Sequence, residues 1–295
     1  MDTETIIDEF GVVGRFPEAA VLASLDARPD TVAAFLSILE RASEPGKLED
    51  REALALFLIV HALAELREKR AYGPLLRLLG GDGGRIEHLL GDAVTETLPQ
   101  ILIALTDGDP APLVALMEDD KADEYVRDAA FSTWTYLVLD GAVDRETAHR
   151  YLEAFEAAPT RPEPGSFVWR AWAGAIALLG FEDLMTLVRR ACEDDRIDPI
   201  IADFDDFLSD LERARSTPPD LLMVDEDLFP FDDTIGRLRS WAAFRPPDPF
   251  DETMDEFDEL YDLHGGDLDA LAETLAESLE PIVNPFRHVG RNDPC

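Results

Sequence analysis

Apolar residues recur along this chain in short helical segments that alternate with longer ones. Four short segments resemble one another and span residues 74–79, 112–117, 150–155 and 183–188. Their equivalent positions are spaced by 38, 38 and 33 residues and are occupied by Leu75, Leu113, Tyr151 and Leu184. A repeat of roughly 35–45 residues built from two helices is typical of an α-solenoid, in which stacked helix pairs share one continuous core.

A longer apolar stripe precedes each short segment, with an apolar side chain at every fourth position. The four stripes are Leu54, Leu58, Ala62 and Leu66; Val94, Leu98 and Leu102; Val126, Ala130, Trp134 and Val138; and Val168, Trp172 and Ile176. This spacing places the side chains on one face of an α-helix, and the alternation typical of strands is scarce. The pattern therefore predicts an all-α fold over residues 1–215, with a first helix, a turn and a second helix repeated four times.

Local signals predict several helix boundaries. Pro17 suits the first turn of a short helix, and Asp30 suits the N-cap of a helix over residues 31–42. Residues 80–84 are rich in glycine and predict an interhelical loop. Pro99 would remove a hydrogen bond inside a helix, so a helix either begins near it or is kinked there.

After residue 215 the composition changes. An amphipathic helix is expected over residues 200–215, and a Pro-punctuated acidic extension follows over residues 216–287, with a further helix at 234–244. Residues 220–280 hold 19 acidic and three basic residues, a net charge of −16. An apolar stripe in this part predicts a helix docked on the repeats and is formed by Phe250, Met254, Phe257, Leu260 and Tyr261. A last helix is predicted over residues 268–279.

The charge of the chain narrows the classes of partner. Its 26 Lys and Arg residues against 63 Asp and Glu residues give a net charge of −37. Such a surface repels phosphate backbones and anionic membranes, so we expect no nucleic-acid partner and no membrane partner. Solubility is the simplest reason for the charge. A dedicated basic partner, metal ions and a salt-rich cytoplasm remain as alternatives.

The start of the chain, its longest apolar stretch and its cysteines indicate the cellular compartment. The acidic start of the chain predicts no signal peptide, and the apolar stretch at residues 53–66 is too short to span a bilayer. Two cysteines, Cys192 and Cys295, do not suggest a disulfide framework. We therefore expect a cytoplasmic protein.

Five segments in the same order resemble the bacterial domain-of-unknown-function family 1186, over about residues 10–245. They lie at residues 67–72, 89–96, 123–130, 164–169 and 232–235. The resemblance implies a HEAT-like α-solenoid, a right-handed superhelix of antiparallel helix pairs. The family has no known activity, so no catalytic residue is carried over from it.

The end of the chain, residues 288–295, resembles the start of a SEC-C motif, a short zinc-binding tail. The run from Gly290 to Cys295 matches that motif up to its first cysteine ligand. The motif continues beyond this point, and structural zinc needs about four ligands. The resemblance therefore implies a chain cut short, in which Cys295 is one ligand of an incomplete zinc site that the full-length protein could complete.

The remaining candidates for chemistry favour structural roles. None of the five histidines forms a close metal pair, and His61 lies in an apolar helix, where a core residue is expected. Residues 80–84 lack the Lys and Ser or Thr of a P-loop, and Ser166 lacks a nucleophile elbow. The acidic clusters at residues 225–233 and 255–262 could gather calcium or magnesium, but they match no EF-hand, and solvated helix faces are the simpler interpretation.

Tryptophans are the candidates for partner anchors. Trp134 and Trp172 fall on apolar stripes and are expected in the core, whereas Trp169 lies one residue off its stripe and is the candidate partner-binding residue. We expect no catalytic and no cofactor-binding residue. The sequence thus predicts a non-catalytic scaffold that binds a protein partner; the alternative is a metal-assisted hydrolase, or another enzyme, with an acidic pocket.

Overall fold

The computed structural model of the chain describes residues 1–26, 28–158 and 161–245. It divides the chain into two compact units, Met1–Trp241 and Ala242–Cys295. Within the described residues all regular structure is helical, which confirms the all-α prediction. None of these helices has both the length and the apolar character that crossing a bilayer demands.

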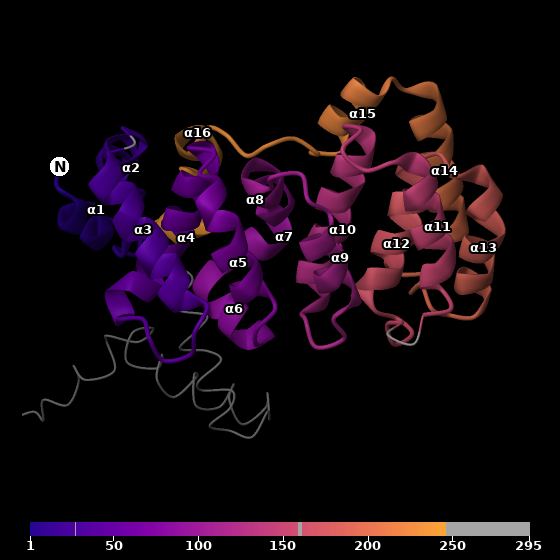
Figure 1. Ribbon diagram of the computed structural model, residues 1–295, viewed down its shortest axis with the longest axis horizontal. Helices are drawn as coiled ribbons and strands as arrows, with labels where there is room; N and C mark the ends of the chain where they lie inside the picture. Colours follow the sequence, from indigo (N-terminus) through magenta and orange to yellow (C-terminus); the bar gives the residue numbers. More distant parts are fainter. Residues whose placement is uncertain (27, 159–160, 246–295) are drawn as a thin grey trace, which may run out of the picture. The chain divides into compact units, whose positions relative to one another are not determined.

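The first unit follows a simple order of elements (Figure 1). Its α-helices are α1 Thr3–Phe10, α2 Glu18–Leu25, α3 Pro29–Ala42, α4 Asp50–Glu65, α5 Tyr72–Leu79, α6 Gly83–Leu90, α7 Ala93–Glu96, α8 Leu98–Leu105, α9 Ala111–Glu118, α10 Glu124–Leu139, α11 Arg145–Phe155, α12 Phe167–Leu178, α13 Met185–Glu193, α14 Phe204–Ser216, α15 Pro219–Asp225 and α16 Thr234–Leu238. Short 3₁₀ turns occur at η1 Lys69–Ala71 and η2 Glu182–Leu184, and η3 Ala242–Phe244 starts the second unit.

The four predicted helix pairs are present as helices in the predicted order. They are α4 with α5, α7 and α8 with α9, α10 with α11, and α12 with α13. Pro99 occupies the first turn of α8, where its missing N–H costs nothing, so a helix begins there rather than kinks.

Three boundary predictions need correction. Gly83 and Gly84 begin α6 instead of filling a loop, because the Asp82 carboxylate caps this helix by accepting from the Arg85 N–H at 2.9 Å. Asp30 lies in the first turn of α3 rather than at its N-cap, which is Arg28. The helix predicted over residues 234–244 is two short elements, α16 and η3.

Neighbouring pairs bury one another's apolar faces. Helix α10 packs against α8, α9 and α12, α12 also packs against α14, and α4 packs against α1, α3 and α8. Trp134 of α10 and Trp172 of α12 are both buried, which confirms the prediction that they belong to the core. Each longer helix is covered on several sides, because no single pair has enough apolar surface to form a core alone.

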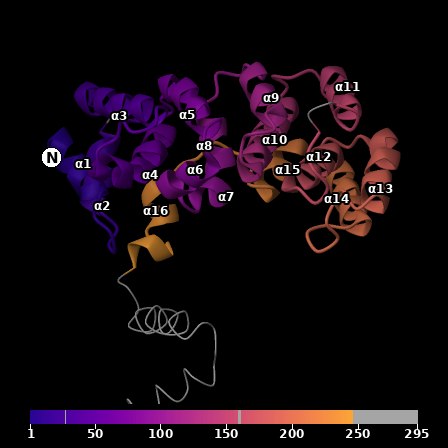
Figure 2. The ribbon, with the colours of Figure 1, turned by 90° about the horizontal axis from the view of Figure 1, so that it is seen from below.

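After α14 the chain reverses along the helices it has already built. This return segment, residues 217–241, brings α15 against α10 and α16 against α2 and α4 (Figures 1 and 2). Between them the Phe231 N–H donates to the Gln100 carbonyl at 3.0 Å. The Thr234 N–H donates to the Glu65 carboxylate at 2.8 Å.

The first compact unit therefore includes residues 216–241, which the sequence analysis assigned to the acidic extension. The rest of that extension, with the stripe at Phe250, Met254, Phe257, Leu260 and Tyr261, lies outside the described residues. So do the helix predicted over residues 268–279 and the tail at residues 288–295.

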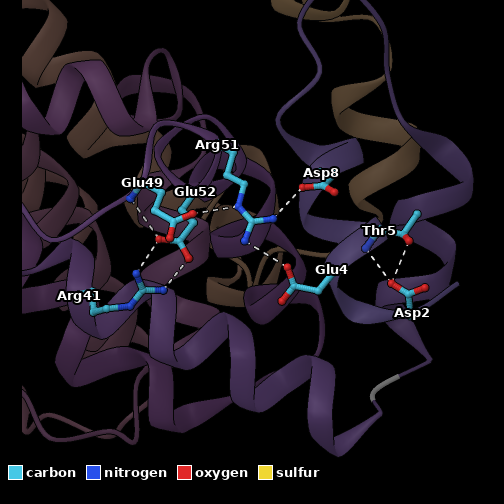
Figure 3. Close-up of polar contacts among 8 residues, drawn as sticks. All are labelled: Asp2, Glu4, Thr5, Asp8, Arg41, Glu49, Arg51 and Glu52. Atoms are coloured by element: carbon cyan, nitrogen blue, oxygen red, sulfur yellow. Dashed lines mark hydrogen bonds and ion pairs between the residues drawn. The ribbon is translucent and has the colours of Figure 1, made fainter.

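Charged side chains tie the first helices together (Figure 3). Arg41 of α3 forms a bidentate pair with Glu52 of α4, at 2.6 and 2.7 Å. Arg51, also of α4, reaches α1 through Asp8 at 2.9 Å and Glu4 at 3.1 Å. The pairs of Arg51 are exposed and contribute little to stability, whereas the bidentate pair fixes the angle between two helices.

A buried histidine anchors the return segment to α4. His61 is 0% exposed, and this burial keeps its ring neutral; its Nδ1 lies 2.7 Å from the Phe57 carbonyl, so Nδ1 carries the proton and donates. The Thr97 hydroxyl lies 2.8 Å from Nε2, where it donates to the ring. Phe231 and Trp241 of the return segment pack on the same imidazole, with ring centroids 4.9 and 6.4 Å away. His61 is a core residue, as the sequence predicts.

This burial predicts a pH dependence of folding stability. Desolvation, with a smaller contribution from Arg237, lowers the pKa of His61 from 6.5 to about 4. Between pH 6.5 and about 4, the imidazole is therefore protonated in the unfolded chain but neutral in the folded protein. The free energy of unfolding falls as the pH drops through this interval. The loss is on the order of 3 kcal/mol.

The measurement is urea unfolding at several pH values in the wild type and in His61→Gln, which cannot titrate there. Carboxylates titrate equally in both proteins and cancel in the difference. The variant should lose less stability over this interval. Equal pH slopes in the two proteins would contradict a neutral, desolvated imidazole.

Candidate functional site

A cavity of about 210 Å³ opens between α10, α12 and α14. Each helix contributes residues spaced about one turn apart, which therefore share one helix face. From α10 these are Asp128, Ser132 and Thr135, and from α12 they are Arg170, Gly174 and Leu178. From α14 and its N-cap they are Asp203, Asp206, Phe207 and Asp210, and the return segment adds Glu226 and Leu228.

Small side chains on α12 leave the space that the cavity occupies. Ala171, Ala173, Ala175 and Ala177 line it together with Gly174. A Cβ placed on Gly174 would meet no other atom within 4 Å, so this glycine faces open space. Larger residues at these positions would close the gap between the helices, because protein interiors otherwise pack without voids.

The hydrogen bonds of Glu124 set the relation between two of these helices. Its carboxylate accepts from the Ser166 hydroxyl at 2.8 Å and from the Phe167 N–H at 2.9 Å. Ser166 is the N-cap of α12, and Glu124 is the first residue of α10. The first turns of the two helices are therefore joined beside the cavity.

Carboxylates dominate the lining of this cavity. Five of them face a single guanidinium, that of Arg170. Asp210 and Glu226 are engaged by Arg213, with Asp210 Oδ1 at 2.8 Å from Nη2, while Asp203 and Asp206 cap the start of α14. Asp128 is left with one weak partner, since Arg170 Nη1 lies 3.5 Å away.

Asp128 is half-buried, with 25% of its side chain exposed, and its surroundings shift its pKa. Desolvation raises the pKa of its carboxyl group above the ordinary value, and Arg170 only partly offsets this. A desolvated carboxylate with one distant partner interacts strongly with a cation that reaches it, because the local dielectric constant is low.

Two further depressions continue the cavity along the same helices. One of about 350 Å³ shares Asp128 and Arg170 with the cavity and adds Pro99, Phe167 and Ile201. The next, of about 420 Å³, shares Val94, Thr95 and Tyr125 with the second and extends to Gly83 of α6. The three hollows thus form one acidic trough, and its acidic side chains are Glu87, Asp92, Asp123, Asp128, Asp203, Asp206, Asp210 and Glu226.

An aromatic pair lies in the middle of the acidic trough. The rings of Tyr125 and Phe167 are 4.8 Å apart, and Tyr125 is 38% exposed. An amphipathic aromatic side chain at the surface offers a large contact area with little conformational freedom to lose. The trough therefore combines negative charge along its length with an apolar contact near its centre.

The two residues that the sequence proposed for binding are Trp169 and Cys295, and neither is found at a described binding surface. Trp169 is only 1% exposed, and its indole N–H donates to the Pro162 carbonyl at 3.3 Å. Its ring packs on Phe155 and Trp172, so Trp169 is a core residue and not a surface anchor. Cys295 lies outside the described residues, and the zinc tail stays a prediction.

The acidic clusters have mixed outcomes. Glu226, from the cluster at residues 225–233, lines the cavity, whereas residues 255–262 lie outside the part of the chain that the structure describes. Among the described residues, no three His, Cys, Asp or Glu side chains gather as a metal site. Cys192 is a free thiol.

The model of DUF1186, a protein family of unknown function, matches residues 1–245. The chain belongs to the DUF1186 family. The match covers the whole first unit, including the return segment and every residue of the acidic trough.

Two chlamydial members of similar sequence are known. An uncharacterized protein of Chlamydia trachomatis is 26% identical over 236 residues, which cover 79% of this chain and 92% of the relative. An uncharacterized protein of Chlamydia muridarum is 25% identical over 235 residues, covering 79% and 93%. No solved structure matches the chain.

Apart from Glu226, sequence reasoning proposed none of the residues that line the cavity as site residues, yet a signal was present. Asp128, Ser132 and Thr135 form a polar stripe on a helix whose other faces are apolar. Polar residues at helical spacing within a buried helix indicate a face that does not meet the core. The stripe could not show which helix it faces, because that depends on contacts distant in sequence.

The open space at Gly174 predicts an unusual pair of substitutions. Gly174→Ala is expected to stabilise the protein by roughly 0.5–1 kcal/mol, because alanine favours the helix and its methyl group meets no atom. Gly180→Ala, two turns later, is expected to destabilise by a similar amount or more, because Gly180 has a φ of +68°. Thermal unfolding of both variants tests the helix geometry; destabilisation by Gly174→Ala would show that the space is filled.

The desolvated carboxylate predicts a stabilising substitution. A carboxyl group whose pKa is raised by folding favours stability at low pH, and that contribution is lost as the pH rises through the raised pKa. Asp128→Asn should therefore raise the urea midpoint at pH 7, with a smaller or reversed effect near pH 3. Asp120→Asn, at an exposed carboxylate, is the matched control and should change little. A lowered midpoint for Asp128→Asn at pH 7 would show that the Arg170 pair stabilises the fold.

Proposed function

We propose that this protein is a non-catalytic helical-repeat module that binds a partner protein along the acidic trough. The observation that carries this proposal is the continuity of the trough: three hollows share lining residues from α6 to α14. A surface assembled from successive helices suits an extended segment of another protein better than a compact small molecule.

The arrangement of helices supports a HEAT-like α-solenoid as the frame for this surface. Contacts form mainly between successive pairs, as when α10 meets α8 and α12, and α12 meets α14. In such a fold each pair adds one strip to a shared face, and the strips together make an extended binding surface.

The charge of the acidic trough indicates the kind of segment it would accept. Its carboxylates outnumber its one lining guanidinium by eight to one. Complementary charge steers a basic partner toward the trough and rejects acidic competitors, while the exposed Tyr125 supplies an apolar contact. This assigns part of the net charge of −37 to recognition in addition to solubility.

Site-specific photo-crosslinking in the native host tests the proposal. A benzophenone amino acid in place of Tyr125 should yield discrete adducts with a partner protein after illumination. The same group in place of Glu153, which is exposed on α11 and lines none of the three hollows, should yield none. Identical adducts from both positions, or no adduct from Tyr125, would contradict binding in the trough.

A further inference from the structure

The cavity between α10, α12 and α14 differs from the rest of the acidic trough in volume and in chemistry. Its volume of about 210 Å³ lies below the range of roughly 300–1,000 Å³ typical of small-molecule and cofactor sites. A space of this size suits one long side chain entering from the trough.

The hydroxyl-bearing residue Thr135 belongs to the wall of this space. It is 1% exposed and lines the cavity. This hydroxyl can accept a hydrogen bond from an N–H donor.

The same wall holds the carboxylate with the weakest pairing in the cavity. Asp128 lies two turns before Thr135 on the same face of α10, and its contact with Arg170 is 3.5 Å long. The side chain of Arg170 is 54% exposed, so it can turn toward solvent when a competing cation arrives. Asp128 and Thr135 together offer acceptors to a cationic donor.

The other surfaces of the cavity suit an aliphatic stem. Gly174 leaves open space, and Ala171, Leu178 and Phe207 provide apolar walls. Lysine and arginine bury their methylene stems against apolar surface while the charged end finds acceptors. The cavity thus pairs apolar walls with buried acceptors, as such a side chain requires.

We propose that this cavity receives one lysine or arginine side chain of the partner segment, with its charged end at Asp128 and Thr135. The inference rests on the proposed function, because it assumes a protein segment in the acidic trough. The shared chemistry is an alkyl ammonium or guanidinium group, whether it belongs to a protein or to a free small cation.

The probes are a fluorescent peptide of alternating arginine and glycine, and the same peptide with citrulline, the neutral isostere of arginine. Fluorescence anisotropy with the full chain should show binding of the arginine peptide and at least roughly tenfold weaker binding of the citrulline peptide. Equal affinity for the two peptides would overturn the proposal.

A substitution that does not change the charge distinguishes binding in the cavity from non-specific electrostatic binding to an acidic protein. Gly174→Leu fills the cavity and should weaken the arginine peptide roughly tenfold, whereas Gly174→Ala should leave its affinity within about twofold. Asp128→Asn should weaken binding to a similar degree, whereas Glu153→Gln removes the same charge elsewhere and should not. Equal effects of the two charge changes, with no effect of Gly174→Leu, would reduce the binding to general electrostatics.

Circular dichroism checks that each variant folds. Should Gly174→Leu unfold, Thr135→Val decides the matter, because it keeps the side-chain shape and removes only the hydroxyl. It should weaken the arginine peptide severalfold, and unchanged affinity in both Thr135→Val and Asp128→Asn would overturn the proposal.

Two further outcomes separate this inference from the proposed function. N-acetylarginine methylamide, titrated by NMR, tests the cavity alone. Binding of this amide to the wild type but not to Gly174→Leu, with no crosslinked partner at Tyr125, would uphold the cavity and remove the proposed function. Crosslinked partners at Tyr125 without binding of either arginine probe would uphold the trough and overturn the cavity proposal.

Discussion

The packing of α10 between α8, α9 and α12 is the constraint on which the rest of the unit depends. Arg127 fixes one end of this packing: it is buried, and its guanidinium donates to the Met117 carbonyl from Nε at 3.0 Å and from Nη2 at 2.8 Å. That carbonyl lies near the end of α9, where the helix has no partner of its own for it. One buried charge therefore joins the end of α9 to α10, and α12 packs on the helix that is held in this way.

The same helix serves the core and the acidic trough on different faces. Trp134 and Phe131 enter the core, while Asp128 and Thr135 face the cavity. Asp128 has one distant partner and a desolvated carboxyl group, and such a residue persists only where the surrounding packing is strong enough to hold it. The small residues of α12 also depend on the surrounding packing, because they leave apolar surface unburied at the cavity.

The return segment adds a second layer of constraint at the other end of the unit. Its aromatic residues cover His61, and its backbone satisfies the carbonyl of Gln100 on α8. It also contributes Glu226 and Leu228 to the wall of the cavity. Residues 217–241, which the sequence assigns to an acidic extension, are therefore part of both the core and the candidate site.

Local patterning was enough to predict the helices of this protein, because amphipathic spacing and capping residues act within a few turns of chain. It placed the helices of the four pairs in order, assigned Trp134, Trp172 and His61 to the core, and left a helix start and a kink as the two alternatives at Pro99. It could not assign Trp169, which lies off the stripe of α12 but contacts Phe155, Trp172 and the Pro162 carbonyl. Local patterning could not predict the cavity either, because contacts between residues distant in sequence form it. Asp128, Gly174 and Asp206 are ordinary residues on three separate helices, and only the packing of α10, α12 and α14 brings them to one space.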